Sequence, residues 1–250
     1  MNPIRKSCVI SQVVLLVAAT CLSAQSRFRA EAVVAGLPVR GTASVSGKIV
    51  LAGSFSTPKP LPVFKSRAFC GPVVANETLL VGRDGGLKNG VVILHAIDRI
   101  AAVEPTQSVL DNQHCAFVPH VQVVAVGSEL LLKNSDPILH TVHARLGTET
   151  FFNVGLPKWR QVTKRLDRAG AIKINCDVLH TWMSAAVVVT DSRYFAVSDE
   201  QGFYRVDGLP AGMYEMEIWH ERLGVQRQKI SVVESGTIVV DVVYSAEKIR

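Results

Sequence analysis

Charged residues are scarce in this chain: Asp, Glu, Lys and Arg make up 19% of its 250 residues, while 48% are hydrophobic. So much apolar side-chain surface with so little charge excludes intrinsic disorder as the main state, and the length allows one or two domains. Clusters of Lys and Arg interleaved with aromatic residues are missing, which argues against nucleic acid as a partner. We therefore expect a folded protein.

Catalytic sequence motifs are absent as well. The chain has no Ser-His-Asp arrangement, no paired-carboxylate motif, no Gly-rich phosphate loop and no HExxH zinc motif. It also lacks the HxH pairs expected of an oxidase with several copper ions. These absences predict that the protein is not an enzyme.

Residues 1–24 have the layout of a secretory signal peptide, because Arg5 and Lys6 precede an apolar run that ends in small residues. The run is shorter than the ~18 residues of a spanning helix, and no later segment is long enough to span a bilayer. We expect cleavage after Ala24 and a periplasmic or secreted product. An uncleaved anchor and a lipidated Cys21 are the alternatives. Cleavage lowers the net charge from +6 to +4, because only two basic residues and no acid are lost.

The rest of the chain predicts an all-β protein. Residues 25–45 are interpreted as a linker, and from Ser46 onward short apolar segments alternate with Gly, Pro, Asn and Asp, as in a β-sandwich or barrel. The best-defined strands are expected at Gly47–Ala52, Gly90–Ile97, His120–Val126, Glu129–Lys133, Ala171–Cys176, Ala185–Thr190, Lys229–Val233 and Thr237–Tyr244. The sequence pattern changes after Thr190, which suggests a first domain over 46–190 and a smaller β unit over 191–246. Alternatively, residues 191–246 are an extension packed on the first sheet.

The strand expected at 171–176 alternates cleanly. Ile172, Ile174 and Cys176 share one face, and the residues between them are polar. The sulfur of Cys176 is therefore expected to point into the interior.

Four residues form a candidate metal site: His140, Cys176, His180 and Met183. Two imidazoles, one thiolate and a weak thioether are the ligand set of a blue-copper electron-transfer centre. Taken singly, His140 could be an ordinary loop histidine and Met183 a core residue, but their conjunction with an inward cysteine favours copper. His143 is expected on the opposite face of its strand, away from the metal.

Several segments carry a family resemblance: CAFVPHV at 115–121, NSDPILHTVH at 134–143, CDVLHTWM at 176–183 and DEQGFYRVDGLPAGMYEMEIWHE at 199–221. The chain resembles the cupredoxin-like family, in particular plastocyanin-like or amicyanin-like periplasmic proteins of the methylamine-utilisation type with a C-terminal carboxypeptidase-regulatory-like domain. The resemblance implies a cupredoxin-like Greek-key β-sandwich, a smaller second sandwich and one type 1 copper ion at the four residues above.

The chain departs from that family at two points. Three residues separate Cys176 from His180, whereas the amicyanin type has two. The first histidine is usually followed by an Asn that pins the ligand loop, and here Thr141 stands in its place, with a hydroxyl as the possible substitute.

Cleavage of the signal peptide leaves three cysteines, and Cys176 is assigned to the metal. The other two, Cys70 and Cys115, are predicted to form a disulfide, because two partnerless thiols in an exported protein meet an oxidising environment. The alternative is a pair of buried free thiols.

Three functions compete on this sequence. The first is a copper protein that carries electrons to a redox partner protein of unknown identity through an exposed edge of His180. The second is copper storage or delivery without a redox role. The third is a metal-free carbohydrate-binding or adhesion protein with Tyr214, Trp219 and His220 as its surface.

Overall fold

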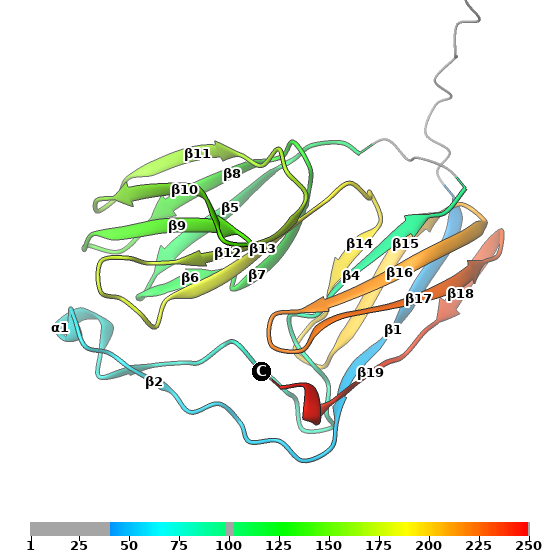
Figure 1. Ribbon diagram of the computed structural model, residues 1–250, viewed down its shortest axis with the longest axis horizontal. Helices are drawn as coiled ribbons and strands as arrows, with labels where there is room; N and C mark the ends of the chain where they lie inside the picture. Colours follow the sequence, from blue (N-terminus) through cyan, green and yellow to red (C-terminus); the bar gives the residue numbers. More distant parts are fainter. Residues whose placement is uncertain (1–40, 99–102, 250) are drawn as a thin grey trace, which may run out of the picture. The chain divides into compact units, whose positions relative to one another are not determined.

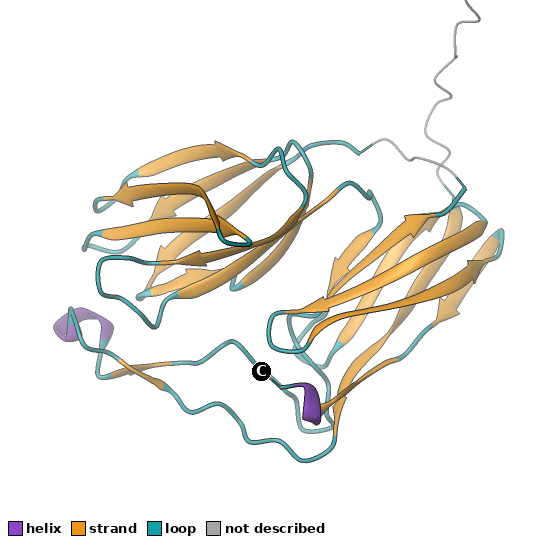
Figure 2. Ribbon diagram, in the orientation of Figure 1, coloured by secondary structure: helices purple, strands orange, loops and turns teal. Residues whose placement is uncertain are grey.

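A computed structural model describes residues 41–98 and 103–249 of the chain. The expected signal peptide and almost all of the expected linker lie outside these residues. The part described is built of strands, with α1 (Arg67–Cys70) and a 3-10 turn, η1 (Ala246–Lys248), as its short helical pieces (Figure 2). Its helices are all too short to cross a membrane.

The first sandwich contains two sheets, drawn mainly in green in Figure 1. One sheet has the order β10-β9-β12-β13-β7, and the other β11-β8-β5-β6. The bounds of the first sheet are β7 Val121–Ala125, β9 His140–Leu146, β10 Glu149–Leu156, β12 Gly170–Asn175 and β13 Ser184–Thr190. Those of the second are β5 Gln107–Gln113, β6 Ala116–Val118, β8 Glu129–Asn134 and β11 Gln161–Arg165. Fully buried Leu110, Phe117, Leu132 and Val187 belong to one hydrophobic cluster between the sheets.

The second sandwich combines strands from both ends of the described chain. Its sheets have the orders β15-β1-β18, with β19 also paired to β1, and β14-β4-β16-β17. The bounds are β1 Thr42–Ala52, β4 Val91–Ala96, β14 Phe195–Val197, β15 Phe203–Leu209, β16 Gly212–His220, β17 Gly224–Val232, β18 Ser235–Val239 and β19 Val242–Ser245. A separate cluster that includes Ile49, Leu94, Tyr214 and Tyr244 forms its core.

This pairing does not follow the expected division at residues 46 and 191. β1 and β4 lie within the range expected for the first domain, yet they pair with strands that follow Thr190. Both strands are largely buried and occupy central positions, β1 between β15 and β18 and β4 between β14 and β16. Local sequence patterns predict strands but not their distant partners, so a discontinuous sandwich was not foreseen.

The six strands expected up to Thr190 are all present, and the structure is all-β as predicted. Five of them differ by one residue at one or both ends, while β1 begins at Thr42, five residues earlier than expected. The strand expected at Thr237–Tyr244 is two strands, β18 and β19, which pair with successive parts of β1. The break has a local cause: Asp241 Oδ1 accepts a hydrogen bond from the backbone N of Lys48 at 2.8 Å, so a side chain replaces the ladder at that point.

The link between β1 and β4, residues 53–90, is shown in cyan in Figure 1. It contains α1 and a small antiparallel pair, β2 (Leu61–Pro62) with β3 (Val73–Val74). Although both ends of the link belong to the second sandwich, Val63 is buried in the hydrophobic cluster of the first.

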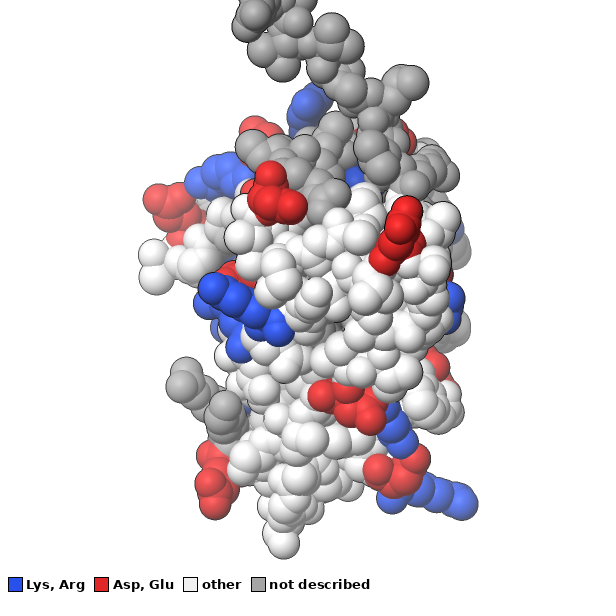
Figure 3. Space-filling view, turned by 90° about the vertical axis from the view of Figure 1, so that its right-hand side faces the viewer, with Lys and Arg blue, Asp and Glu red and all other residues white. Residues whose placement is uncertain are grey.

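Acidic and basic side chains are intermixed on the face drawn in Figure 3, where red and blue groups are scattered among uncharged atoms. This view shows no concentration of one sign among the described residues of that face. This mixture of acidic and basic groups agrees with the modest net charge of the sequence.

The strand pairing predicts that residues 191–250 cannot fold alone, because they lack the central strands β1 and β4. We expect the isolated segment to give the circular dichroism spectrum of an unfolded chain, whereas a protein beginning at residue 41 gives a β spectrum. A cooperative thermal transition in the isolated segment would contradict this pairing.

Candidate metal centre

The first candidate ligand, His140, begins β9 after a tight turn. Asn134, at the end of β8, accepts a hydrogen bond from the backbone N of Asp136 at 3.0 Å and donates to the carbonyls of Ile138 and Leu156, each at 2.8 Å. A short polar side chain that bonds its own backbone two residues on is typical of such turns. The turn places the fully buried imidazole of His140 at the end of the sandwich that holds the other candidate ligands.

The other candidate ligands come from the connection between β12 and β13. Cys176 directly follows β12, and its side chain is buried on the same face as Ile172 and Ile174, as the alternation predicted. His180 follows within a short loop, and the backbone N of Met183 donates to the carbonyl of His180 at 2.9 Å. Met183 is buried in the hydrophobic cluster that also contains Cys176.

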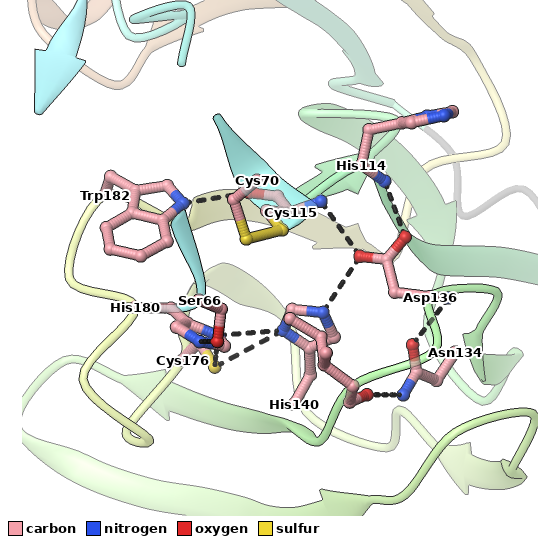
Figure 4. The surroundings of a disulfide bond; sticks show 11 residues. Ser66, Cys70, His114, Cys115, Asn134, Asp136, His140, Cys176, His180 and Trp182 are labelled. Carbon is pink, nitrogen blue, oxygen red and sulfur yellow. Dashed lines mark hydrogen bonds and ion pairs between the residues drawn. A yellow bond between two sulfur atoms is a disulfide. The ribbon is translucent and has the colours of Figure 1, made fainter. Parts of the chain in front are cut away.

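Three of these side chains converge (Figure 4). The Nδ1 atoms of His140 and His180 lie 3.1 Å apart, and Cys176 Sγ lies 3.9 Å from the first and 3.7 Å from the second. Metal–nitrogen and metal–sulfur bonds of about 2.0 to 2.3 Å place ligand atoms on one ion roughly 3 to 4 Å apart. The observed separations fit a single ion held by all three atoms.

The carboxylate of Asp136 fixes the orientation of His140. Asp136 Oδ2 lies 2.9 Å from His140 Nε2, and both side chains are buried. Because an ionised carboxylate only accepts hydrogen bonds, Nε2 carries the proton and Nδ1 keeps a free lone pair. Asp136 also accepts from the backbone N of His114 at 2.7 Å and of Cys115 at 2.9 Å. These donors replace the water that the buried charge has lost.

Thr141 holds the thiol of Cys176 in place. Its backbone N lies 3.3 Å from Cys176 Sγ and its hydroxyl 3.7 Å away. The same hydroxyl accepts from the backbone N of Asp177 at 2.6 Å, so it ties the strand of His140 to the loop that follows Cys176. Thr141 thus connects the segment of His140 to the segment that follows Cys176.

The imidazoles of the cluster are disposed to be neutral. Burial, followed by the nearby His140 and Lys65, lowers the pKa of His180 to about 4. Burial also lowers the pKa of His140, and the neighbouring Asp136 carboxylate offsets only part of this effect. Neutral imidazole is the form that binds a metal ion, so neither histidine must first lose a proton at neutral pH.

Cys70 and Cys115 form a disulfide with a Cα–Cα distance of 5.6 Å. Cys115 is fully buried, and its carbonyl accepts a hydrogen bond from Trp182 Nε1 at 3.0 Å. The ring of Trp182 lies 5.1 Å, centroid to centroid, from that of His180. The disulfide therefore adjoins the candidate metal site on two sides, through Asp136 and through Trp182.

Two expectations about individual residues were wrong. His180 has no exposed edge, since it is 1% exposed. Tyr214, Trp219 and His220 do not form a surface either, because all three are buried. The hydroxyl of Tyr214 donates to the carbonyl of Pro210 at 2.8 Å.

His143 lies outside the cluster, as expected from its odd offset on β9. Its Nδ1 lies 2.6 Å from Asp177 Oδ2 and its Nε2 2.9 Å from Thr150 Oγ1. Both ring nitrogens are therefore used by other partners.

Sequence reasoning missed two residues beside the site. Asp136 was not among the candidate site residues, although an acid four residues before a candidate ligand could have suggested the contact with His140. Ser66, whose hydroxyl lies 3.4 Å from His180 Nε2, gave no signal, because it lies more than a hundred positions earlier in the chain.

No family model matches the chain, and no curated protein matches it. Among solved structures, a purple cupredoxin from Nitrosopumilus maritimus is 19% identical over 34% of this chain and 99% of its own, with a TM-score of 0.30. A reduced amicyanin variant is 18% identical over 39% of this chain and 99% of its own, also with a TM-score of 0.30. A copper-containing nitrite reductase from Thermus scotoductus SA-01 is 20% identical over 38% of this chain but only 25% of its own, with a TM-score of 0.32. These similarities concern part of the chain, and the case for a metal depends on the residues themselves.

Replacing Asp136 by Ala should destabilise the metal-free protein by about 3 kcal/mol, because three donors, two of them buried, lose their acceptor. Urea unfolding followed by circular dichroism measures the effect. The matched control is Asp167→Ala, which alters an exposed aspartate and should change the free energy of unfolding by less than about 0.5 kcal/mol. Equal stabilities for the two variants would show that Asp136 does not organise the site.

Proposed function

We propose that this chain is an exported, cupredoxin-like protein that binds one copper ion through His140, Cys176, His180 and Met183 and carries electrons. The observation that supports this most directly is the convergence of His140 Nδ1, His180 Nδ1 and Cys176 Sγ, which all lie within 4.8 Å of one another. All three side chains are buried, and a buried thiol between two imidazoles is hard to explain by packing alone.

The residues around the cluster suit that role. Copper would supply one-electron chemistry, and the soft thiolate and thioether favour its reduced state while the imidazoles serve both states. Asp136 and Thr141 hold His140 and Cys176 from outside the cluster, so the ligand positions are set by the fold before a metal arrives. A site fixed in this way changes little when an electron is gained or lost. The redox partner is a protein of unknown identity.

Storage or delivery of copper is the second candidate, and one observation favours it. A carrier of the expected kind would present the edge of a ligand imidazole to its partner, whereas His180 is covered. A metal-free carbohydrate-binding or adhesion function is disfavoured, because the aromatic residues expected to form its binding surface are buried.

The second sandwich is proposed to be a carboxypeptidase-regulatory-like unit that supports the copper-binding one. The segment 199–221, which carries this resemblance, contains all of β15 and all of β16. With β1 and β4 added, this unit is discontinuous in sequence.

The absorption spectrum after addition of Cu(II) tests the copper site. We expect an intense band at about 600 nm from a thiolate–copper bond, absent in Cys176→Ala. His143→Gln is the matched control, since this nearby histidine lies outside the cluster, and it should keep the band. Absence of both the band and bound copper in the native protein would refute the proposal.

Redox titration of the loaded protein then separates the carrier from the storage protein. A carrier should pass through repeated one-electron cycles with one copper ion retained. Release of the ion on reduction would favour storage or delivery.

Export is supported by the N-terminal sequence pattern and by the disulfide, since disulfides persist mainly in oxidising compartments. We predict that the protein recovered from the periplasm or medium of a bacterial host begins at Gln25. Mass spectrometry of the intact protein measures this directly, and a retained residue 1 would instead indicate an uncleaved anchor.

A further inference from the structure

The loop that carries His180 lies at the surface, yet the imidazole does not. Leu179, next to it in sequence, is 65% exposed, while His180 is 1% exposed. Ser66 Oγ lies 3.4 Å from the outer ring nitrogen, Nε2, of His180 (Figure 4). Ser66 belongs to the link between β1 and β4, so this contact comes from outside the strands of the first sandwich.

Residues 61–74 of that link, here named the cover, form a closed loop. β2 pairs with β3 at its base, the backbone N of Val63 donates to the carbonyl of Pro72 at 3.0 Å, and α1 lies at its tip. Val63 is 2% exposed and packs in the cluster that contains Cys176 and Met183. Phe64, the next residue, is 74% exposed. The cover therefore has an inner side anchored in the core and an outer side in solvent.

Ser66 has an unusual conformation for its contact with His180. Its φ is 56°, in the left-handed region that few residues other than Gly, Asn and Asp adopt. It stands at the N-cap of α1, but its hydroxyl makes no capping bond and is directed at His180 instead. Residues held in a disfavoured backbone conformation cluster at functional sites. The conformation of Ser66 and its uncapped helix end therefore support a functional role for its contact with His180.

The disulfide fastens the tip of the cover. Cys70 ends α1, and its partner Cys115 has its backbone N bound to Asp136, which in turn holds His140. The cover is thus connected to both candidate histidine ligands. It contacts His180 through the Ser66 hydroxyl, and it is linked to His140 through the disulfide, Cys115 and Asp136.

We propose that the cover seals the metal site, with Ser66 positioning His180 and the Cys70–Cys115 disulfide as its clasp, so that opening of the cover limits access to Cys176 and to bound copper. The part that concerns copper rests on the proposed function. The part that concerns access to Cys176 does not, because it applies to the metal-free protein as well.

The first test measures alkylation of Cys176 by iodoacetamide in the metal-free protein, with peptide mapping to identify the modified cysteine. The double variant Cys70→Ser/Cys115→Ser should react about tenfold faster than the native protein, because thiol reactivity follows exposure and local opening. The matched control is Leu209→Ala, which alters a fully buried side chain in the core of the second sandwich and should leave the rate within about twofold. An unchanged rate in a folded double variant would overturn the proposal.

Circular dichroism shows whether the double variant is folded. Should it fail to fold, Val63→Ala takes its place, since this change removes an inner anchor of the cover and keeps the disulfide. It should also accelerate alkylation of Cys176 relative to Leu209→Ala, and an unchanged rate would again overturn the proposal.

A second test isolates the Ser66 hydroxyl. Ser66→Gly removes it without a backbone penalty, because Gly adopts positive φ freely. The ¹⁵N chemical shifts of the His180 ring in the metal-free protein should then change, since Nε2 loses its partner. Unchanged shifts would show that Ser66 does not position His180.

A third test uses the copper-loaded protein and bicinchoninate, a chelator of Cu(I). Removal of copper should be about tenfold faster from the double variant than from native protein. If the native protein binds no copper but the alkylation contrast is present, the proposed function fails and the cover stands. If copper binds and both rates are equal in native and variant protein, the cover fails and the proposed function stands.

Discussion

The buried carboxylate of Asp136 accepts hydrogen bonds from three directions: the imidazole of His140 and the backbone N–H groups of His114 and Cys115. A charge removed from water is costly unless donors replace its hydration, and here the donors come from two parts of the site, the imidazole of His140 and the turn of His114 and Cys115. The β8–β9 turn, the turn that carries Cys115, and the first candidate ligand are therefore positioned together. If one of these parts moved, the carboxylate would lose part of its compensation.

The cover extends this dependence to the second imidazole. His140 is held from within the first sandwich, while His180 is held by a residue that enters from the β1–β4 link. The link begins and ends on strands of the second sandwich, so the candidate metal site draws on a segment whose ends are fixed elsewhere. Val63 and Cys70 anchor the cover at the first sandwich, while Leu79 and Leu87, later in the same link, are buried in the core of the second.

Much of the fold and the ligand cluster could be predicted from sequence because those features are local. Alternation around Ile172, Ile174 and Cys176 fixes the direction of the thiol, and the short spacing to His180 fixes the loop that bears it. Pairing between β1 and the C-terminal strands could not be predicted, because the sequence of a strand does not identify the distant strand with which it pairs. The burial of His180 was missed for the same reason, since the residue that covers it lies in a segment without a motif. A contact of the Thr141 hydroxyl could be considered from the sequence because Thr141 adjoins the candidate ligand His140, and the structure shows this hydroxyl bound to the backbone N of Asp177.

The pairing of cysteines also has a consequence for oxidative folding. Cys115 and Cys176 each have a sulfur within 4.8 Å of a His140 ring nitrogen, so the two sulfurs approach the same imidazole. A disulfide between them would consume the thiol that a metal needs. In the structure Cys115 is bonded instead to Cys70, with a sequence separation of 45. Cys176 is therefore left as the free cysteine among the described residues, and its thiol stays available to a metal.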